Sequence, residues 1–354
     1  MSLKELDNYL IECTSRKKIP GCVCWVGSQH ETSFSEKYGY AQITPQNMLM
    51  KKDTVFDLAS LTKPIATALS IMILQEKGLL KIGDRLGDTL PVFKNTGCNN
   101  TTIKQLLTHT SGLPAWYPTY LIPENERLQR LASLATGKQE VVYSCLGYIL
   151  LGKVIEHVSG ITLDRFLRQN ITKKVGLNTL RFGPVSDTTE IAPTEQGNGH
   201  EQKMAIQYGD ISEIKWRQHL LQGEVHDGNA FYGFQGVAGN AGLFSDIQDL
   251  VRFTRAYLGG EIINSDTRAL MTKDHTGGEE KRSLGWRVDP YPGVLSPTAF
   301  GHTGFTGTML VIDPQHDLII VLLANAVHPK VKLGLMNPIR ENVVRIIAGS
   351  IRPK

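Results

Sequence analysis

The sequence has 354 residues, of which 41% are hydrophobic and 20% are charged, so we expect a folded globular protein of one or two domains. The net charge of +4 is small and no long run of Lys or Arg occurs, which argues against nucleic acid as the main partner. No segment reaches about 18 uninterrupted apolar residues, so we expect no membrane span. The N-terminal segment has no long apolar core and the five cysteines are scattered, which predicts a cytoplasmic protein without a disulfide framework.

The first part of the chain predicts one helix, two strands and a second, buried helix. Residues 4–17 alternate apolar and charged positions at helical spacing. Two short strand-like runs follow, at 22–27 and 32–40, separated by a polar turn. Residues 64–77 are apolar on nearly all sides and end at Gly78, which is typical of a helix in the middle of a fold.

The rest of the chain predicts helices first and strands last. A helix over 145–158 precedes another that Thr162 caps and that extends to about Asn170. The polar, Gly-rich residues 183–240 allow no assignment. Three further expectations complete the chain: a capping box of Ser245 and Gln248 for a helix over 246–258, an apolar hairpin with strands 308–312 and 318–323, and a final amphipathic helix over 337–348. We therefore expect one sheet built from both ends of the chain, with a largely helical region between them.

The motif Ser-x-x-Lys is the first candidate for chemistry, and it occurs three times, starting at Ser15, Ser60 and Ser212. The first and third copies lie in charged, solvated stretches, whereas Ser60 and Lys63 directly precede the buried helix. A Ser and a Lys three residues apart at a helix start share one face, so the amine can reach the hydroxyl and activate it as a nucleophile. By itself, the motif fits equally well a Ser60 that only caps the helix and a solvated Lys63.

Two other segments carry residues of the same chemistry. Tyr143 precedes the second buried helix, where it could relay a proton beside a lysine ammonium, although a lone Tyr at this position usually only packs. The glycines around His302, Thr303 and Gly304 would let a strand edge approach a ligand closely, and His302 could titrate near neutral pH. The alternative for this second segment is a Gly-rich strand entry with an exposed His.

Together these pieces resemble the penicillin-recognising serine enzymes, a superfamily with class C β-lactamases, penicillin-binding proteins, D-aminopeptidases and esterases. The motifs Ser60-Leu-Thr-Lys63, Tyr143-Ser-Cys145 and His302-Thr-Gly304 have the order and rough spacing of that superfamily, and the resemblance covers about residues 18 to 345. It implies a β-lactamase/transpeptidase-like α/β fold, an α+β sandwich with an antiparallel sheet flanked by helices. Residues 1–58 with 240–354 would form the sheet domain and 59–239 a mainly helical domain, with the active site between them.

The resemblance also implies a role for each matching residue. Ser60 would be the nucleophile and Lys63 its hydrogen-bonded partner, while Tyr143 would act as the general base in acylation and as the acid toward the leaving group. The backbone N–H groups of Ser60 and Phe305 would form the oxyanion hole. His302, Thr303 and Gly304 would line one wall of the site.

Two departures from the pattern bear on substrate choice. Cys145 stands where the superfamily usually has Asn, and a thiol is too weak a donor and acceptor to bind both a substrate amide and Lys63. His302 stands where most lactam-binding members have Lys, so a fixed cation for a substrate carboxylate is missing. We therefore expect an esterase-like or peptidase-like enzyme rather than an efficient β-lactamase.

The expected activity is hydrolysis of an amide or ester, in a D-amino-acid peptide, an ester or a β-lactam, through an acyl-enzyme and without a metal or organic cofactor. The partner would be a small-molecule, peptide or ester substrate. Two alternatives remain: a penicillin-binding receptor that never deacylates, and a degenerate scaffold without turnover. Two other patterns in the sequence do not predict a site. Gly147–Val154 is close to a nucleotide-binding P-loop but lacks its Ser/Thr, and Cys22 and Cys24 have no partner pair at the spacing of a zinc site.

Overall fold

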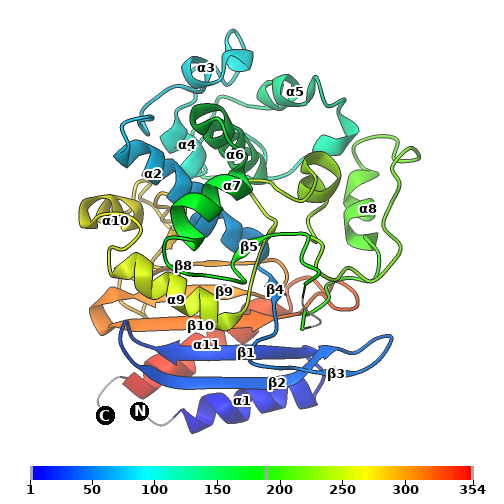
Figure 1. Ribbon diagram of the computed structural model, residues 1–354, viewed down its shortest axis with the longest axis vertical. Helices are drawn as coiled ribbons and strands as arrows, with labels where there is room; N and C mark the ends of the chain where they lie inside the picture. Colours follow the sequence, from blue (N-terminus) through cyan, green and yellow to red (C-terminus); the bar gives the residue numbers. More distant parts are fainter. Residues whose placement is uncertain (1–2, 188–189, 352–354) are drawn as a thin grey trace.

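The computed structural model describes residues 3–187 and 190–351 and is built around a seven-stranded sheet (Figure 1). The strand order is β3-β2-β1-β10-β9-β8-β7, and every neighbouring pair is antiparallel. Both ends of the chain contribute strands, as the sequence predicts, and the central pair β1 and β10 joins them. The strands of this sheet are β1 Gly21–Gly27, β2 Thr32–Gln42, β3 Met48–Leu49, β7 Arg287–Val288, β8 Phe300–Thr303, β9 Met309–Asp313 and β10 Leu318–Ala324.

The central strands are apolar along their whole length because both faces of the sheet are covered. Side chains of a strand point alternately to the two faces, so that Val23 and Trp25 of β1 pack into one hydrophobic cluster and Cys22 and Cys24 pack into another. The two thiols are therefore buried core groups, and burial raises the pKa of both.

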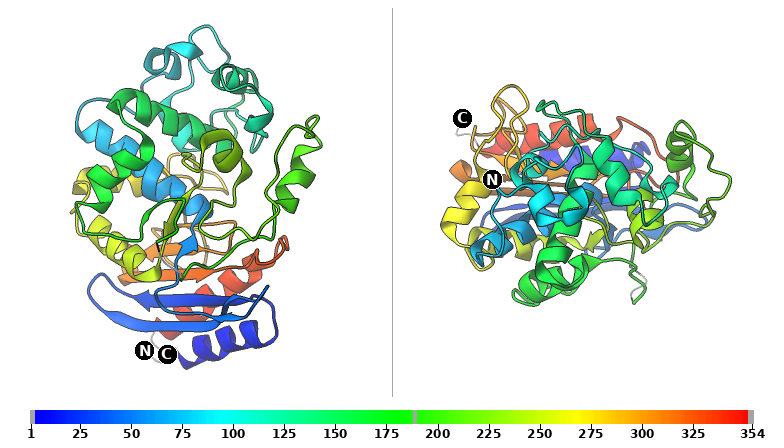
Figure 2. Two further views of the ribbon diagram at one scale, coloured as in Figure 1. Left: turned by 45° about the vertical axis from the view of Figure 1, so that its right-hand side comes forward. Right: turned by 90° about the horizontal axis from the view of Figure 1, so that it is seen from above.

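Two terminal helices, α1 Lys4–Ser15 and α11 Met336–Ile351, cover one face of the sheet (Figures 1 and 2). They contact each other and bury Leu6 and Leu10 of α1 against the sheet cluster that also holds Val343 and Ile347 of α11. The N-terminal and C-terminal segments thus close one layer of the fold together.

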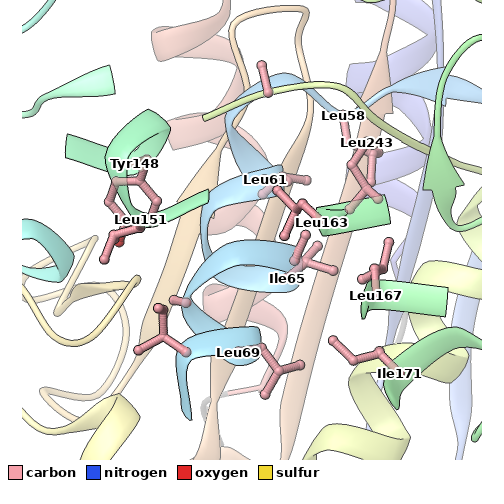
Figure 3. Close-up of a cluster of buried hydrophobic side chains, with 14 of the residues drawn as sticks. Leu58, Leu61, Ile65, Leu69, Tyr148, Leu151, Leu163, Leu167, Ile171 and Leu243 are labelled. Carbon is pink, nitrogen blue, oxygen red and sulfur yellow. The ribbon is translucent and has the colours of Figure 1, made fainter. Parts of the chain in front are cut away.

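The opposite face carries the helical region, whose centre is a continuous helical segment made of η1 Ala59–Leu61, η2 Lys63–Ala68 and α2 Leu69–Glu76. Leu61, Ile65 and Leu69 lie in its buried core together with Leu163 and Leu243 from more distant parts of the chain (Figure 3). This is the helix that its all-apolar composition predicts for the middle of the fold. The buried segment carries Ser60 and Lys63 at its start.

Shorter elements surround this segment. A second sheet of three short strands, in the order β4-β6-β5, lies where the chain passes between the large sheet and the helices. The bounds are β4 Phe56–Asp57, β5 Arg181–Phe182, β6 Leu243–Ser245, α3 Leu86–Thr89, α4 Ile103–Leu107, α5 Arg127–Ser133, α6 Cys145–Ser159, α7 Leu163–Leu167, α8 Gly199–Ala205, α9 Ile247–Leu258 and α10 Ser265–Thr272, with turns η3 Pro91–Phe93, η4 Thr119–Leu121, η5 Arg168–Thr172, η6 Asn229–Gly233 and η7 Pro314–His316.

Two predicted helix caps are wrong. Helix α9 is capped by Asp246, whose carboxylate accepts from the N–H of Asp249, rather than by a box of Ser245 and Gln248. Thr162 does precede α7, but its side chain makes no capping hydrogen bond. Residue type alone indicates which side chains could cap a helix. The backbone geometry at the helix start decides which of them reaches a free N–H group.

No single helix within the described residues is long and apolar enough to cross a membrane, although the bent pair Cys145–Ser159 and Leu163–Thr172 would pass by length and composition. The predicted division into residues 1–58 with 240–354 and residues 59–239 stays a prediction. Its first part holds the whole seven-stranded sheet, and its second part holds α2 to α8.

Candidate active site

The serine and lysine of the central motif are in contact. Lys63 donates a hydrogen bond of 2.9 Å from Nζ to Ser60 Oγ and another of 3.0 Å to the backbone carbonyl of Asn240. Lys63 is fully buried, whereas the Ser60 side chain is partly exposed. The alternative of a solvated Lys63 is therefore wrong, and the lysine lies behind the hydroxyl, inside the protein.

Aromatic rings enclose the buried ammonium. The Nζ atom lies 5.0 Å from the centroid of the Tyr143 ring and 5.8 Å from that of Tyr148. Burial lowers the pKa of Lys63, but the neighbouring Cys145 and Tyr143 together outweigh it and leave the pKa raised above its ordinary value. Lys63 thus enters the site as a buried hydrogen-bond donor to Ser60.

Tyr143 lies two residues before α6 and is surrounded by nitrogen-bearing side chains. Its ring centroid is 4.6 Å from that of His109 and 5.8 Å from that of His302, and the Arg282 guanidinium lies 5.2 Å from it. The His109 ring accepts a hydrogen bond of 2.9 Å at Nδ1 from the N–H of Ser144, the residue that caps α6. His109 thus has a structural role, since it fixes the backbone beside Tyr143.

Cys145 is the first residue of α6 and lines the cleft with its partly buried thiol. Burial raises the pKa of this thiol, and the nearby Lys63 only partly offsets that effect. The group is therefore neutral at neutral pH. It offers a substrate a small, weakly polar surface in place of an amide.

The turn between β8 and β9 packs directly against the chain that leads to Ser60. Thr308 donates from Oγ1 to the backbone carbonyl of Leu58 at 3.0 Å. A Cβ atom on Gly304 would lie 2.5 Å from the same carbonyl oxygen, so only glycine permits this approach. Within the described residues, the N–H group of Phe305 donates no backbone hydrogen bond. This turn therefore brings a free N–H donor next to the segment that carries Ser60, as the predicted oxyanion hole requires.

The expectation that His302 titrates near neutral pH is wrong. The side chain is buried, and its burial together with the positive charges of Lys63 and Arg282 holds the pKa well below its usual value. Its Nδ1 lies 2.8 Å from the carbonyl oxygen of Thr303 and donates to it, while Nε2 has no partner among the described residues. His302 is thus a neutral ring with a free acceptor nitrogen.

A single cleft of about 860 Å³ joins these groups. Its lining includes every predicted site residue except Lys63, which lies behind Ser60; these are Ser60, Tyr143, Cys145, His302, Thr303, Gly304 and Phe305. Side chains of α8, which extends from the helical region in Figure 1, line the same cleft. The structure therefore brings together residues that lie as much as 245 positions apart in the sequence.

Sequence reasoning missed the arginines that line this cleft, among them Arg282. Arg282 is buried, pairs with the carboxylate of Glu280, and keeps an Nε atom without a partner within the described residues. It lies in an irregular segment before β7, where no motif marks it. Because His302 is neutral, Arg282 supplies the buried positive charge that the sequence did not predict for this wall.

The sequence also missed an acidic part of the cleft. Glu201 of α8 and Asp227 line it, and Glu201 accepts a hydrogen bond of 2.9 Å from the hydroxyl of Tyr120. Burial and the nearby Asp227 raise the pKa of Glu201 to about 8. Both acids fall in residues 183–240, whose weak periodicity gave no assignment.

A buried lysine bonded to a serine, beside a tyrosine and between an antiparallel sheet and a helical region, is the arrangement of a hydrolase of the β-lactamase and penicillin-binding-protein type. The chain belongs to the family described as Beta-lactamase, whose family model matches residues 6–344. The predicted fold and the predicted resemblance are both confirmed.

Relatives within this family have several names. A protein of Escherichia coli (strain K12) named D-alanyl-D-alanine carboxypeptidase is 33% identical over 340 residues, which cover 86% of this chain and 76% of that protein. A protein of Bacillus subtilis (strain 168) named N-acetylmuramyl-L-alanine amidase is 32% identical over 334 residues, 84% of this chain and 74% of its own. The solved structure of EstCE1, described as a hydrolase with promiscuous acyltransferase activity, matches with a TM-score of 0.76 at 20% identity, over 98% of this chain and 97% of its own.

Proposed function

We propose that the protein is a serine hydrolase that cleaves an amide or ester through an acyl-enzyme on Ser60. The hydrogen bond of 2.9 Å between Ser60 and the fully buried Lys63, at the wall of a large cleft, is the observation that carries this proposal. Burial of a charged side chain costs free energy unless hydrogen bonds offset that cost. Here one of the hydrogen bonds of Lys63 goes to the Ser60 hydroxyl, which faces the cleft.

In the proposed reaction the Ser60 Oγ attacks the substrate carbonyl carbon, and the phenolate form of Tyr143 accepts the Ser60 proton and becomes a phenol. The N–H groups of Ser60 and Phe305 stabilise the negative charge that develops on the carbonyl oxygen. Tyr143 then gives the proton to the leaving nitrogen or oxygen as its bond to carbon breaks. Water attacks the ester on Ser60 in the second half of the cycle, and Ser60 is regenerated with release of the acid.

We favour a substrate whose leaving group carries a carboxylate. Arg282 is a buried cation that lines the cleft beside Tyr143, with its guanidinium 5.2 Å from that ring, and a guanidinium binds a carboxylate with paired hydrogen bonds. The relatives named D-alanyl-D-alanine carboxypeptidase and N-acetylmuramyl-L-alanine amidase both have names that describe amide bonds to an alanine nitrogen. A peptidase-like activity on an amide whose leaving group is an amino acid is therefore preferred over a simple esterase activity.

Cys145 favours a second candidate on the acyl side of the bond. An acyl group that carries an α-acylamide, as in a D-alanyl peptide or a penicillin, would meet the thiol where it needs a strong hydrogen-bond donor. An acyl group without that amide, as in an N-acetylmuramyl amide, loses nothing there. An amidase of the second type is thus a candidate beside the carboxypeptidase, and efficient β-lactam hydrolysis is the least favoured activity.

The first test is intact-mass spectrometry of wild type and Ser60→Ala after exposure to a fluorophosphonate and, separately, to benzylpenicillin. We expect a Ser60-dependent adduct with the fluorophosphonate and a slow or absent adduct with benzylpenicillin. A stable penicillin adduct without turnover would favour the receptor alternative, and the absence of any adduct would favour the degenerate scaffold.

The second test measures release of free alanine. Purified enzyme is incubated with an acyl-D-alanyl-D-alanine peptide or with N-acetylmuramyl-L-alanine, and Ser60→Ala is the control in both reactions. Ser60-dependent release from either substrate supports the amide hydrolase, and the substrate that reacts faster selects between the two candidates. Ester hydrolysis without alanine release from either substrate would contradict the peptidase-like preference.

A further inference from the structure

We propose that Asp57 is a positioning residue that holds the two halves of the oxyanion hole at a fixed distance from each other. This inference rests on the proposed function. Asp57 ends β4, is 2% exposed and does not line the cleft, so it touches no substrate. Its hydrogen bonds nevertheless reach both segments whose N–H groups would bind the oxyanion.

The first half is the turn that leads to Ser60. One carboxylate oxygen of Asp57 accepts from the N–H of Ala59 at 2.8 Å, which forms an Asx turn. Ala59 has a φ of +47°, a left-handed conformation that costs a non-glycine residue about 1 kcal/mol or more. The Asp57 carboxylate thus stabilises the strained residue next to the nucleophile, and with it the direction of the Ser60 N–H.

The second half is the turn that holds Phe305. The other carboxylate oxygen of Asp57 accepts from the N–H of His226 at 2.7 Å, and the His226 ring stacks on Phe305 with centroids 5.5 Å apart. The backbone carbonyl of Asp57 accepts from Thr306 Oγ1 at 2.7 Å. Asp57 is therefore hydrogen-bonded to the chain neighbour of each proposed oxyanion donor. Without these bonds the Phe305 ring, which is 44% exposed, would be free to move.

Electrostatic repulsion alone predicts the opposite effect of Asp57 on the rate of acylation. A carboxylate close to a developing oxyanion repels it, so removal of the charge at position 57 would speed acylation if only electrostatics mattered. Geometry predicts that acylation slows, because misplaced donors no longer match the transition state. The two effects have opposite signs, which makes an isosteric neutral substitution decisive.

The test is Asp57→Asn. Its amide oxygen can still accept from Ala59, but its NH₂ group would face the N–H of His226, so one half of the link is lost. The matched control is Asp313→Asn, a carboxylate that is likewise buried and accepts from the backbone N–H groups of Ser296 and Gln315, at the other end of β9 from the turn. The rate of fluorophosphonate labelling at Ser60, and kcat and KM for p-nitrophenyl acetate, are measured together with the unfolding midpoint.

We expect Asp57→Asn to lower the labelling rate and kcat by about 10- to 100-fold with KM changed less than about twofold. Asp313→Asn should keep both rates within about threefold of wild type, even if its unfolding midpoint falls as far as that of Asp57→Asn. If Asp57→Asn does not fold, Thr306→Val removes the bond to the Asp57 carbonyl and should lower kcat in the same way by a smaller factor. Unchanged or faster labelling in Asp57→Asn, or equal losses in the Asp313 control, would overturn the inference. A wild type that is not labelled at Ser60 would overturn the proposed function itself.

Discussion

Lys63 reaches Ser60 from inside the protein, with its ammonium 2.9 Å from the hydroxyl oxygen and no exposed surface of its own. The second bond of that ammonium goes to the backbone carbonyl of Asn240, 177 residues further along the chain. A backbone carbonyl cannot be lost by a side-chain substitution. Lys63 therefore stays fixed even though Cys145 replaces the amide that the resemblance leads one to expect.

Replacement of Arg282 should reveal what the leaving group carries. We expect Arg282→Gln to lower kcat/KM for acyl-D-alanyl-D-alanine by about 10- to 100-fold, since a charge-assisted pair with the carboxylate is lost. Hydrolysis of the corresponding C-terminal amide should change less than about threefold, because that substrate has no carboxylate. Rates of alanine or alaninamide release measure both effects.

The control for this variant is Arg287→Gln. Arg287 also lines the cleft but is exposed, so its charge is screened by solvent and its loss should change either rate less than about threefold. Equal losses for both substrates in Arg282→Gln would mean that the arginine only supports Tyr143 and binds no carboxylate.

Restoration of the amide at position 145 should improve recognition of β-lactams. We expect Cys145→Asn to speed acylation by benzylpenicillin by about tenfold or more, because Asn can donate to the acylamide carbonyl while a thiol donates weakly. Adduct formation over time, followed by intact mass, measures the rate. Cys145→Ser is the control of similar size, and an Asn variant that acylates no faster than wild type would reject this account of the thiol.

Glu201 should make stability depend on pH in the alkaline direction. Its pKa is raised to about 8 in the folded protein, above its value in the unfolded chain, so the neutral form stabilises the fold and that contribution is lost as pH rises through about 8. Relative to Glu201→Gln, wild type should lose about 2 kcal/mol of unfolding free energy between pH 6 and pH 9. Urea unfolding at the two pH values measures the difference.

If the unfolding free energies of wild type and Glu201→Gln change in parallel with pH, Glu201 ionises at its ordinary pKa and the prediction is wrong. Asp249→Asn controls for the loss of a hydrogen-bonded carboxylate in itself, since this side chain of α9 accepts from the N–H groups of Asn178 and Thr179 away from the cleft.

A side chain at position 304 should separate the two segments that carry the proposed oxyanion hole. The Cβ atom of Gly304→Ala would lie 2.5 Å from the carbonyl oxygen of Leu58, so the turn must shift away from Ser60. We expect a loss of about 1–3 kcal/mol in stability and a fall of at least about tenfold in the rate of Ser60 labelling. Denaturant unfolding and labelling kinetics measure the two effects.

Gly349→Ala is the matched control for that change. Gly349 lies in α11 with open space around the added methyl group, so alanine there should raise stability by up to about 1 kcal/mol and leave labelling unchanged. Full labelling activity in Gly304→Ala would contradict the requirement for close approach of the two segments.

Local patterns in the sequence were enough for most of the fold. The apolar run 309–312 of β9, the apolar strand β10 and the mainly apolar helix that follows Lys63 could be predicted because burial on all sides strongly favours apolar residues. The three motifs around Ser60, Tyr143 and His302 were found as well, because each has a fixed spacing of only a few residues.

The irregular residues 183–240 could not be predicted, and they hold Glu201, Asp227 and His226. Their positions depend on long-range contacts, such as the bond from the N–H of His226 to the carboxylate of Asp57 across 169 residues. No local pattern encodes such a contact. Arg282 escaped detection for the same reason, since only the fold places it over the Tyr143 ring.

The sequence by itself determined which residues of the cleft could carry covalent chemistry, because a hydroxyl, an amine and a phenol are chemical facts of Ser60, Lys63 and Tyr143. Tertiary structure alone decided the surroundings of the groups in the site. Burial makes His302 neutral and removes Lys63 from solvent, although the sequence suggested a histidine that titrates near neutral pH and left open a solvated lysine. The physical reason is that a pKa depends on the solvent and charges around a group, and these are brought together only when distant segments pack.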